Sequence, residues 1–265
     1  MSEKTPRFLR CSDNCYHIDG NGIGFGAPYR FLARDIPSGR ISETARFAFG
    51  MTVDSEGFHR DHRSGGKMKR TPYHIFVNVF HGKLGEWCLY DYLSSLGDYH
   101  CSEPDMEVYP MGIWDDGDAT VTNDNDDLVR IVAIKTTKRI GNLLLLETAD
   151  WSAEGLYLPS SADGLGYVPN RFVLMRIDPF LSVYDKELES LVNKKDYNGV
   201  LSFVMDSHWR YDVPGFITDD DFKFLVKERY VIPQNSFLNK KDASHRMDAE
   251  NYYIASKWMR PMPTV

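Results

Sequence analysis

The spacing of apolar positions predicts one long helix in the first half of the chain. From Ile75 to Leu96, apolar side chains recur at intervals of three, four and seven residues, as in a helix with one buried face. The pattern stops at Gly97, a residue type favoured just beyond helix ends. Shorter helices are predicted around 41–50, after the turn Ile36-Pro37-Ser38-Gly39, in a stretch beginning at 185–191, and near 219–229.

Strand patterns follow the long helix at short intervals. β-type runs span Met106–Met111, Asp118–Thr122 and Leu128–Thr137, and Phe172–Ile177 forms another. Leu143–Leu146 is entirely apolar, so we expect it at the centre of a sheet. A helix followed by strands with turn-length connections predicts an α/β (α+β) fold, in which a central mixed β-sheet is flanked by helices.

Alternation along the Leu128–Thr137 strand divides its side chains between two faces. Ile131, Ala133 and Lys135 share one face. The other face carries Val132, Ile134 and Thr136. Lys135 therefore points in the same direction as Ala133.

Length and composition indicate a compact domain. The 265 residues are 42% hydrophobic and 13% aromatic, which is enough to bury a substantial core. Neither an internal repeat nor a low-complexity linker divides the chain. We expect one domain over 1–265, with a core at about 75–180 and elaborations at 1–74 and 181–265 that serve partner binding or dimerisation.

Nothing in the sequence indicates export or a membrane span. No run approaches 18 consecutive apolar residues, and MSEKTPRFLR lacks the apolar stretch of a secretory signal. The four cysteines, Cys11, Cys15, Cys88 and Cys101, are few for this length. We therefore expect a cytoplasmic protein that does not enter a membrane.

Two N-terminal patterns are weak. Cys11, Cys15 and His17 could supply three zinc ligands, but the usual two-residue spacing and a second ligand pair are missing. GNGIGFG at 20–26 resembles a dinucleotide loop, yet no apolar strand precedes it and no amphipathic helix follows. A flexible turn is the better interpretation of this glycine-rich stretch.

Charge is distributed unevenly along the chain. The net charge is −7, which alone argues against a nucleic-acid partner. Between Asp98 and Leu128, however, there are ten acidic residues and no Lys or Arg, and removing these ten charges from −7 leaves +3. FHRDHRSGGKMKR at 58–70 suits phosphate contacts, although a solvated loop without a partner would have the same composition. Its cationic residues are Arg60, Arg63, Lys67, Lys69 and Arg70.

The stretch DDGDATVTNDNDDLVRIVAIKTTK at 115–138 supplies groups for phosphodiester hydrolysis. That reaction at neutral pH uses a divalent hard cation, and carboxylate, carbonyl and water oxygens suit Mg²⁺. A nearby lysine can orient or deprotonate the attacking water. The chain offers Glu86 on the long helix, Asp118 at the start of one strand and Lys135 near the end of the next.

These residues resemble the PD-(D/E)xK nuclease superfamily, and more closely its type II restriction endonuclease-like members. Asp118 followed by Ala133-Ile134-Lys135 is similar to the Asp that opens one strand and the acid-x-Lys triplet that ends the next. Gly82-Lys83-Leu84-Gly85-Glu86 is similar to a helix that precedes the sheet, and Pro104–Tyr109 to a PD-acid strand. The resemblance covers roughly a third of the chain, about Phe58 to Trp151.

One position departs from the family pattern. Ala133 stands where the superfamily usually has an acid, and an alanine side chain cannot bind a metal. The resemblance implies that Glu86 replaces this acid and that the Ile134 carbonyl is a further ligand, with Asp118 and Lys135 completing the site. The departure is equally compatible with a nuclease-like protein that binds DNA or a protein partner without cleavage.

Other polar residues have competing interpretations. Asp105 belongs to a literal Pro-Asp and rivals Asp118, but one predicted strand separates it from the Lys135 strand. Asp115 and Asp116 are expected in a loop. Lys83 is a DNA contact or the partner of Glu86 in an i, i+3 ion pair, and Lys138 is a phosphate contact or plain surface.

The sequence thus favours a Mg²⁺-dependent endonuclease of restriction type that acts on double-stranded DNA. Cutting a palindromic site requires a two-fold arrangement, so we expect a homodimer. A metal-dependent enzyme that acts on RNA or on a small phosphorylated molecule is a remoter alternative.

Overall fold

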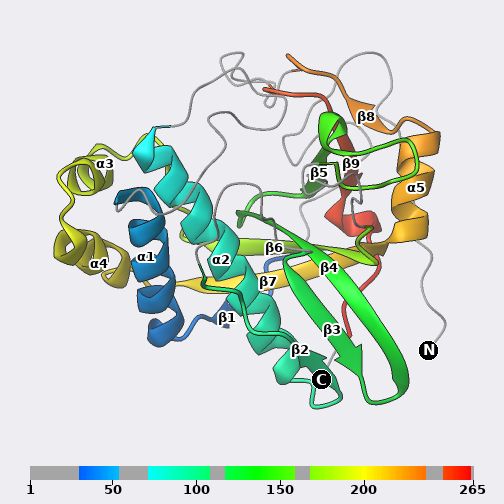
Figure 1. The fold of residues 1–265 in the computed structure, drawn as a ribbon, viewed down its shortest axis with the longest axis horizontal. Helices are drawn as coiled ribbons and strands as arrows, with labels where there is room; N and C mark the ends of the chain where they lie inside the picture. Colours follow the sequence, from blue (N-terminus) through cyan, green and yellow to red (C-terminus); the bar gives the residue numbers. More distant parts are fainter. Residues whose placement is uncertain (1–29, 54–70, 108–116, 159–167, 237–246, 264–265) are drawn as a thin grey trace.

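The protein folds around two β-sheets that are covered by helices (Figure 1). The computed structural model describes residues 30–53, 71–107, 117–158, 168–236 and 247–263. The α-helices are α1 (Ser38–Val53), α2 (Pro72–Ser94), α3 (Lys186–Asn193), α4 (Tyr197–Met205) and α5 (Asp219–Lys227), and two short 3-10 helices are η1 (Thr148–Asp150) and η2 (Ser256–Trp258). The expected α/β (α+β) class, with a mixed sheet and helical cover, is confirmed.

The larger sheet has six strands in the order β1-β7-β6-β4-β3-β2. Its strands are β1 (Arg34–Asp35), β2 (Tyr99–Cys101), β3 (Ala119–Asn123), β4 (Asp126–Lys138), β6 (Arg171–Asp178) and β7 (Arg210–Thr218). β4 and β6 pair in parallel and the other neighbours are antiparallel, so the sheet is mixed. The smaller sheet is antiparallel, in the order β5 (Leu143–Glu147), β9 (Asn251–Ala255) and β8 (Val231–Ile232).

The two faces of β4 contribute to two different hydrophobic clusters. Val132 and Ile134 pack in the larger cluster, which contains the apolar face of α2 and also side chains of α1, α3 and α4. Ala133 packs in a second cluster with side chains from α5, β5 and β9. The alternation expected from the sequence is therefore confirmed for this strand.

Helix α2 begins and ends where the sequence signals indicate. The Thr71 side chain accepts a hydrogen bond from the His74 N–H at 3.2 Å, and Pro72 occupies the first turn, where its missing N–H costs nothing. Beyond the helix, Gly97 has a φ of +82°, a conformation that glycine adopts most easily. The predicted helix over Ile75–Leu96 is confirmed, but it starts three residues earlier, at Pro72, and ends two residues earlier, at Ser94.

The strand expected at Met106–Met111 is not formed at Met106 and Glu107, the two residues of this range that the structure describes. The chain instead pairs with β3 through β2, and Met106 and Glu107 lie in no strand, whereas 108–111 fall outside the described residues. Pro104 cannot donate to a strand ladder, and Asp105 accepts a hydrogen bond from the Glu107 N–H at 2.8 Å, which favours a local turn.

The expectation that Leu143–Leu146 is a central strand is wrong, because β5 lies at the edge of the smaller sheet. Leu144 and Leu146 pack in the second cluster. Leu143 and Leu145 pack on the opposite side, in a third cluster with Ile232 and Tyr253. β5 is therefore buried on both faces by two hydrophobic clusters although it is an edge strand. An edge strand buried in this way has the same run of apolar residues as a strand at the centre of a sheet.

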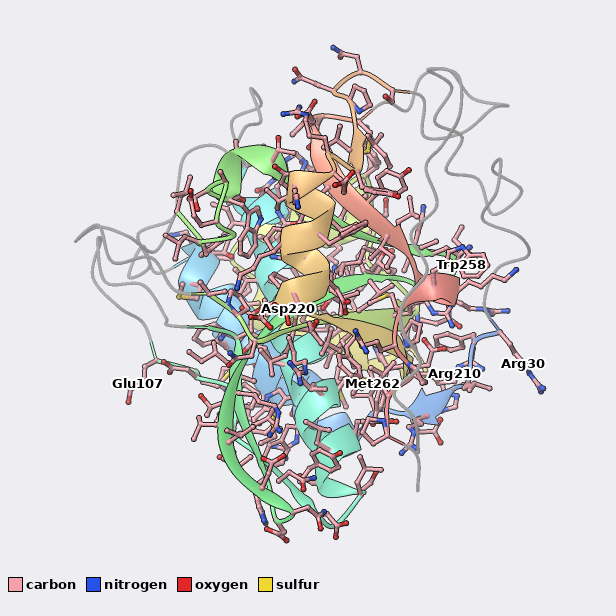
Figure 2. All side chains as sticks on the ribbon, turned by 90° about the vertical axis from the view of Figure 1, so that its right-hand side faces the viewer. Arg30, Glu107, Arg210, Asp220, Trp258 and Met262 are labelled. Carbon is pink, nitrogen blue, oxygen red and sulfur yellow. The ribbon has the colours of Figure 1, made fainter. Side chains whose placement is uncertain are left out.

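A buried ion pair joins β6 to β7. Arg176 and Asp212 have side chains that are only 1% and 4% exposed, and Nε of Arg176 donates to Asp212 Oδ1 at 2.8 Å. The Leu32 N–H donates to Asp212 at 2.9 Å, and Arg176 donates to the Arg30 carbonyl at 3.1 Å. The segment that leads into β1 is thereby bound to the sheet, and Figure 2 shows Arg30 on the same side of the molecule as Arg210.

No helix within the described ranges combines the length and the apolar character that a bilayer crossing requires.

Gly85 allows α2 to approach β4 closely. A Cβ atom added at this position would overlap the hydroxyl of Thr136 and would lie 3.6 Å from Cγ2 of Ile134. Gly82, one turn earlier on the same helix, has nothing within 4 Å of the equivalent position. The two glycines therefore differ in packing although both lie in the helix interior.

We expect Gly82→Ala to raise the free energy of unfolding by about 0.5–1 kcal/mol, because alanine is the better helix former. Gly85→Ala should instead lower it by about 1–2 kcal/mol, because the methyl group displaces Thr136 or lifts the helix from β4. Urea denaturation followed by circular dichroism measures both changes. Equal effects of the two substitutions would contradict the close packing.

His81 is buried in its neutral form. Its Nε2 accepts a hydrogen bond from the Leu181 N–H at 3.0 Å, and its ring stacks on Phe180 with centroids 3.7 Å apart. Burial lowers the pKa of His81 from 6.5 to about 3.

Because the unfolded chain binds this proton below pH 6.5 and the folded chain does not, stability should fall with decreasing pH. The contribution of His81 is fully present above pH 6.5 and is lost at up to about 1.4 kcal/mol per pH unit as the pH falls toward 3. Chemical denaturation at a series of pH values should show a shallower slope for His81→Gln. Parallel pH profiles for both proteins would contradict a neutral buried imidazole.

Candidate active site at the edge of the sheet

Asp118 lies immediately before β3 and contacts the middle of β4. Its N–H donates to the Val132 carbonyl at 3.1 Å, and its carboxylate Oδ2 accepts a hydrogen bond from the Ile134 N–H at 2.5 Å. Gly117, the residue before it, has a φ of +145°, so the main chain turns away from the ladder at this point. The carboxylate thus takes the place of the next main-chain acceptor.

The same edge presents the Ile134 carbonyl. In a strand, the N–H and C=O of one residue are directed to the same side, so this carbonyl faces the side on which Asp118 lies. β3 begins only at Ala119, which lies opposite Val132. Two oxygen groups, a carboxylate and a peptide carbonyl, therefore lie close together just before β3 begins, where β4 continues beyond its pairing with β3.

Lys135 lies on the same face of the sheet as Asp118. Ala119 is opposite Val132, so alternation places Asp118 opposite Ala133, on the face of the second cluster. Lys135, two residues beyond Ala133, shares that face and is half-buried. Among the described residues, Lys135 has no hydrogen bond or ion pair and Asp118 has no ion pair. A half-buried lysine and a carboxylate that keep their charges unpaired are available for a ligand.

Glu86 approaches from the other face, on α2. Its side chain is 8% exposed and forms an ion pair of 2.8 Å with Lys83, whose side chain is 17% exposed. Burial, and next the charge of Glu86, raise the pKa of the Cys101 thiol on β2 to about 12. Glu86 therefore lies between α2 and the sheet, and the i, i+3 ion pair that the sequence left open is the arrangement observed.

The remaining predicted DNA contacts are only partly described. Lys138 is exposed at the end of β4. The five cationic residues Arg60, Arg63, Lys67, Lys69 and Arg70 lie outside the described residues, as do Cys11, Cys15, His17, the 20–26 stretch, Asp115 and Asp116.

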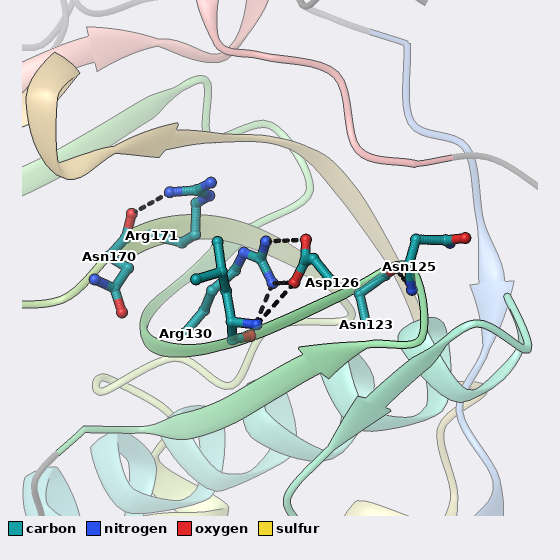
Figure 3. A network of polar contacts seen from close by, with 7 residues as sticks. Asn123, Asn125, Asp126, Arg130, Asn170 and Arg171 are labelled. Atoms are coloured by element: carbon teal, nitrogen blue, oxygen red, sulfur yellow. Dashed lines mark hydrogen bonds and ion pairs between the residues drawn. The ribbon is translucent and has the colours of Figure 1, made fainter.

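The acidic residues of the β3–β4 hairpin have local partners. Asp126 pairs with Arg130 at 2.5 Å, and Figure 3 shows this pair close to Asn123 and Asn125. The hydrogen bond from Arg130 is the main reason that the pKa of Asp126 is lowered. Asp124 similarly lies 2.7 Å from His100. These interactions leave Asp118 as the acid of this stretch that faces β4 without an ion-pair partner among the described residues.

Asp105, the rival of Asp118, lies in the loop after β2. Its carboxylate accepts the Glu107 N–H, and β3 stands between β2 and β4 in the sheet. Asp118 is therefore the better placed of the two acids to act with Lys135.

The donor set at the sheet edge suits a hard cation that keeps part of its water shell. No group of three or more His, Cys, Asp or Glu side chains suited to a metal occurs in the described part of the chain. Asp118 uses Oδ2 for the Ile134 N–H, and its Oδ1 remains available. One carboxylate oxygen and a peptide carbonyl are oxygen donors of the kind that Mg²⁺ accepts together with waters, whereas Glu86 lies on the opposite face of the sheet, paired with Lys83.

Sequence reasoning missed the polar residues that support β4 from the other side. The Asn170 side chain accepts a hydrogen bond from the Ile131 N–H at 2.7 Å, and Arg171 donates to the Asn170 carbonyl at 2.8 Å (Figure 3). The available signal was an asparagine just before an apolar strand, a position at which its side chain often replaces a main-chain partner.

The chain matches no protein-family model, no curated protein and no solved structure in comparisons with known proteins.

Replacing Asp118 separates its structural role from its charge. Asp118→Asn keeps a side-chain oxygen for the Ile134 N–H and should change the free energy of unfolding by less than about 1 kcal/mol, whereas Asp118→Ala leaves a buried N–H without its acceptor and should cost about 1–3 kcal/mol. Urea denaturation distinguishes these outcomes. If the two variants were equally stable, the bond to Ile134 would not contribute to the fold.

Proposed function

We propose that this protein is a Mg²⁺-dependent DNA endonuclease of restriction type, which hydrolyses phosphodiester bonds of double-stranded DNA. The observation that carries the proposal is the contact of the Asp118 carboxylate with the Ile134 N–H, beside the unpaired Lys135 on the same face. An acid and a lysine held on adjacent strands by main-chain geometry are what a hydrolytic site needs for preorganisation.

In this proposal, the Asp118 carboxylate and the Ile134 carbonyl would hold the cation. Bound Mg²⁺ acidifies a water molecule and neutralises charge on the phosphoryl oxygens. Lys135 orients or deprotonates the attacking water and stabilises the charge that develops on the phosphate. Ala133 leaves the space beside Lys135 free of a carboxylate.

Glu86 is proposed as the third ligand, in place of the acid that Ala133 does not provide. It comes from the α2 side, so it would have to reach the cation from the face opposite to Asp118. Lys83 neutralises Glu86 in the structure, at 2.8 Å. Binding a cation at Glu86 therefore requires that Lys83 release it, which allows Lys83 to contact a DNA phosphate.

DNA binding in this proposal uses Lys83, Lys138 and the cationic stretch at 58–70. Outside the acidic block the chain carries +3, so association with a duplex should weaken as salt rises. A homodimer would place two such sites on the two strands of a palindromic sequence.

A second candidate is a nuclease-like protein that binds DNA or a protein partner without cutting. The Ala133 position and the ion pair that already occupies Glu86 favour it. Salt-dependent DNA binding that persists in Lys135→Ala, without cleavage by either protein, would support this candidate over the endonuclease.

Plasmid DNA incubated with the protein and Mg²⁺ tests the endonuclease. Lys135→Ala and Asp118→Asn should each lower the cleavage rate by about 100-fold or more, because each removes a group that acts in the transition state. Glu86→Gln should lower it as well. Gel electrophoresis over a time course measures these rates.

Lys227→Ala is the matched control, since Lys227 is exposed on α5. It should cut at the unmodified rate. DNA that stays intact with the unmodified protein, across many sequences and states of base modification, would overturn the endonuclease.

A further inference from the structure

Arg139 and Arg210 converge on one carboxylate at the end of the larger sheet. Nη2 of Arg210 lies 2.6 Å from Oδ2 of Asp178, and Nη1 of Arg139 lies 3.5 Å from the same oxygen. The side chains of Arg139 and Arg210 are 54% and 37% exposed. Two guanidinium groups thus share a single negative charge, which leaves an excess positive charge at the surface. We call these three residues the cationic end of the sheet.

Among the described residues, Asp178 is the carboxylate that forms ion pairs with Arg139 and Arg210. The buried Arg176 is already paired with Asp212, and the ring of Phe31 lies 5.8 Å from the Arg139 guanidinium and 5.5 Å from that of Arg176. Asp35 lies opposite Arg210 in the β1–β7 pair, but its carboxylate is 3.0 Å from His208. The guanidinium of Arg139 therefore retains donors for another acceptor.

The cationic end lies on the same face of the sheet as Lys135. Lys135 is opposite Leu174, and alternation along β6 places Arg176 and Asp178 on the Leu174 face. Arg210 lies opposite Asp178, and the Arg139 N–H still bonds to the Ile177 carbonyl at 3.0 Å, in continuation of the β4–β6 pairing. Lys135 and Arg139 are four residues apart, or about 13 Å along an extended strand.

We infer that Arg139 and Arg210 bind a backbone phosphate of the same duplex whose scissile phosphate lies at Asp118 and Lys135, an inference that rests on the proposed function. A spacing of about 13 Å corresponds to about four base pairs along the duplex axis. The guanidinium groups of Arg139 and Arg210 can donate several hydrogen bonds to the oxygens of a phosphate. Asp178 holds these two groups close together before a phosphate binds.

Fluorescence anisotropy with a labelled duplex of about 20 base pairs, without divalent cation so that it stays intact, tests the inference. Arg139→Ala should weaken binding about three- to ten-fold. It should also reduce the slope of log affinity against log salt by about 0.9, because one phosphate fewer is neutralised by the protein. Arg139→Glu should weaken binding further, and Arg210→Gln should resemble Arg139→Ala.

Arg229→Ala is the matched control, because Arg229 is 69% exposed and pairs with Glu250 at 3.4 Å on another part of the surface. Its affinity and salt slope should equal those of the unmodified protein. Thermal unfolding of each variant checks that the fold is retained.

The outcomes separate this inference from the endonuclease proposal. Unchanged affinity and salt slope in Arg139→Ala and Arg139→Glu would overturn the phosphate-binding role, even if the plasmid is cut normally. A salt slope that falls in these variants, with no cleavage by any of the proteins, would support the phosphate-binding role and reject the endonuclease. Failure of the unmodified protein to bind the duplex at low salt would overturn the inference directly.

Discussion

The ion pair of Arg176 with Asp212 is the constraint on which the arrangement of the larger sheet depends. Both charges are almost completely buried, so each is tolerated only because the other, and the peptide groups of Arg30 and Leu32, satisfy it. The pair joins the neighbouring strands β6 and β7 and binds the segment that leads into β1. Strand pairing, the attachment of residues 30–33 to the sheet and the position of the cationic end are therefore energetically coupled.

The two faces of the sheet divide structural and chemical roles. On one face, the absence of a side chain at Gly85 lets α2 lie against Ile134 and Thr136, and α1, α3 and α4 complete that layer. The opposite face, with α5, β5 and β9 over one part, carries Asp118, Lys135, Arg139 and Arg210. Those four residues lie away from the helical layer, and the buried charge that this layer does contain, Glu86 on α2, is paired with Lys83.

Local patterns in the sequence were sufficient for several of the regular elements, but not for the strand β7 or for the loop at Met106 and Glu107. Helix α2, the alternation along β4 and the adjacency of Asp118 to the Lys135 strand follow from local periodicity. The edge position of β5 did not, because an apolar run reports burial and not strand order. The meeting of Arg139 with Arg210 was equally hidden, since it joins segments 71 residues apart through pairing that no local pattern encodes. Glu86 was placed on its helix, but its distance from the strands was not accessible from spacing.

The pairing of β4 with β6 has a consequence for how the chain tolerates change. A single inserted or deleted residue within β4 would invert the orientation of every side chain beyond it, turning Lys135 under α2 and moving Ile134 to the opposite surface. The core and the candidate site would then be damaged together. Length variation in β4 should accordingly be far less tolerable than the exchange of individual side chains. The packing of the core and the position of the candidate site both depend on the same strand register.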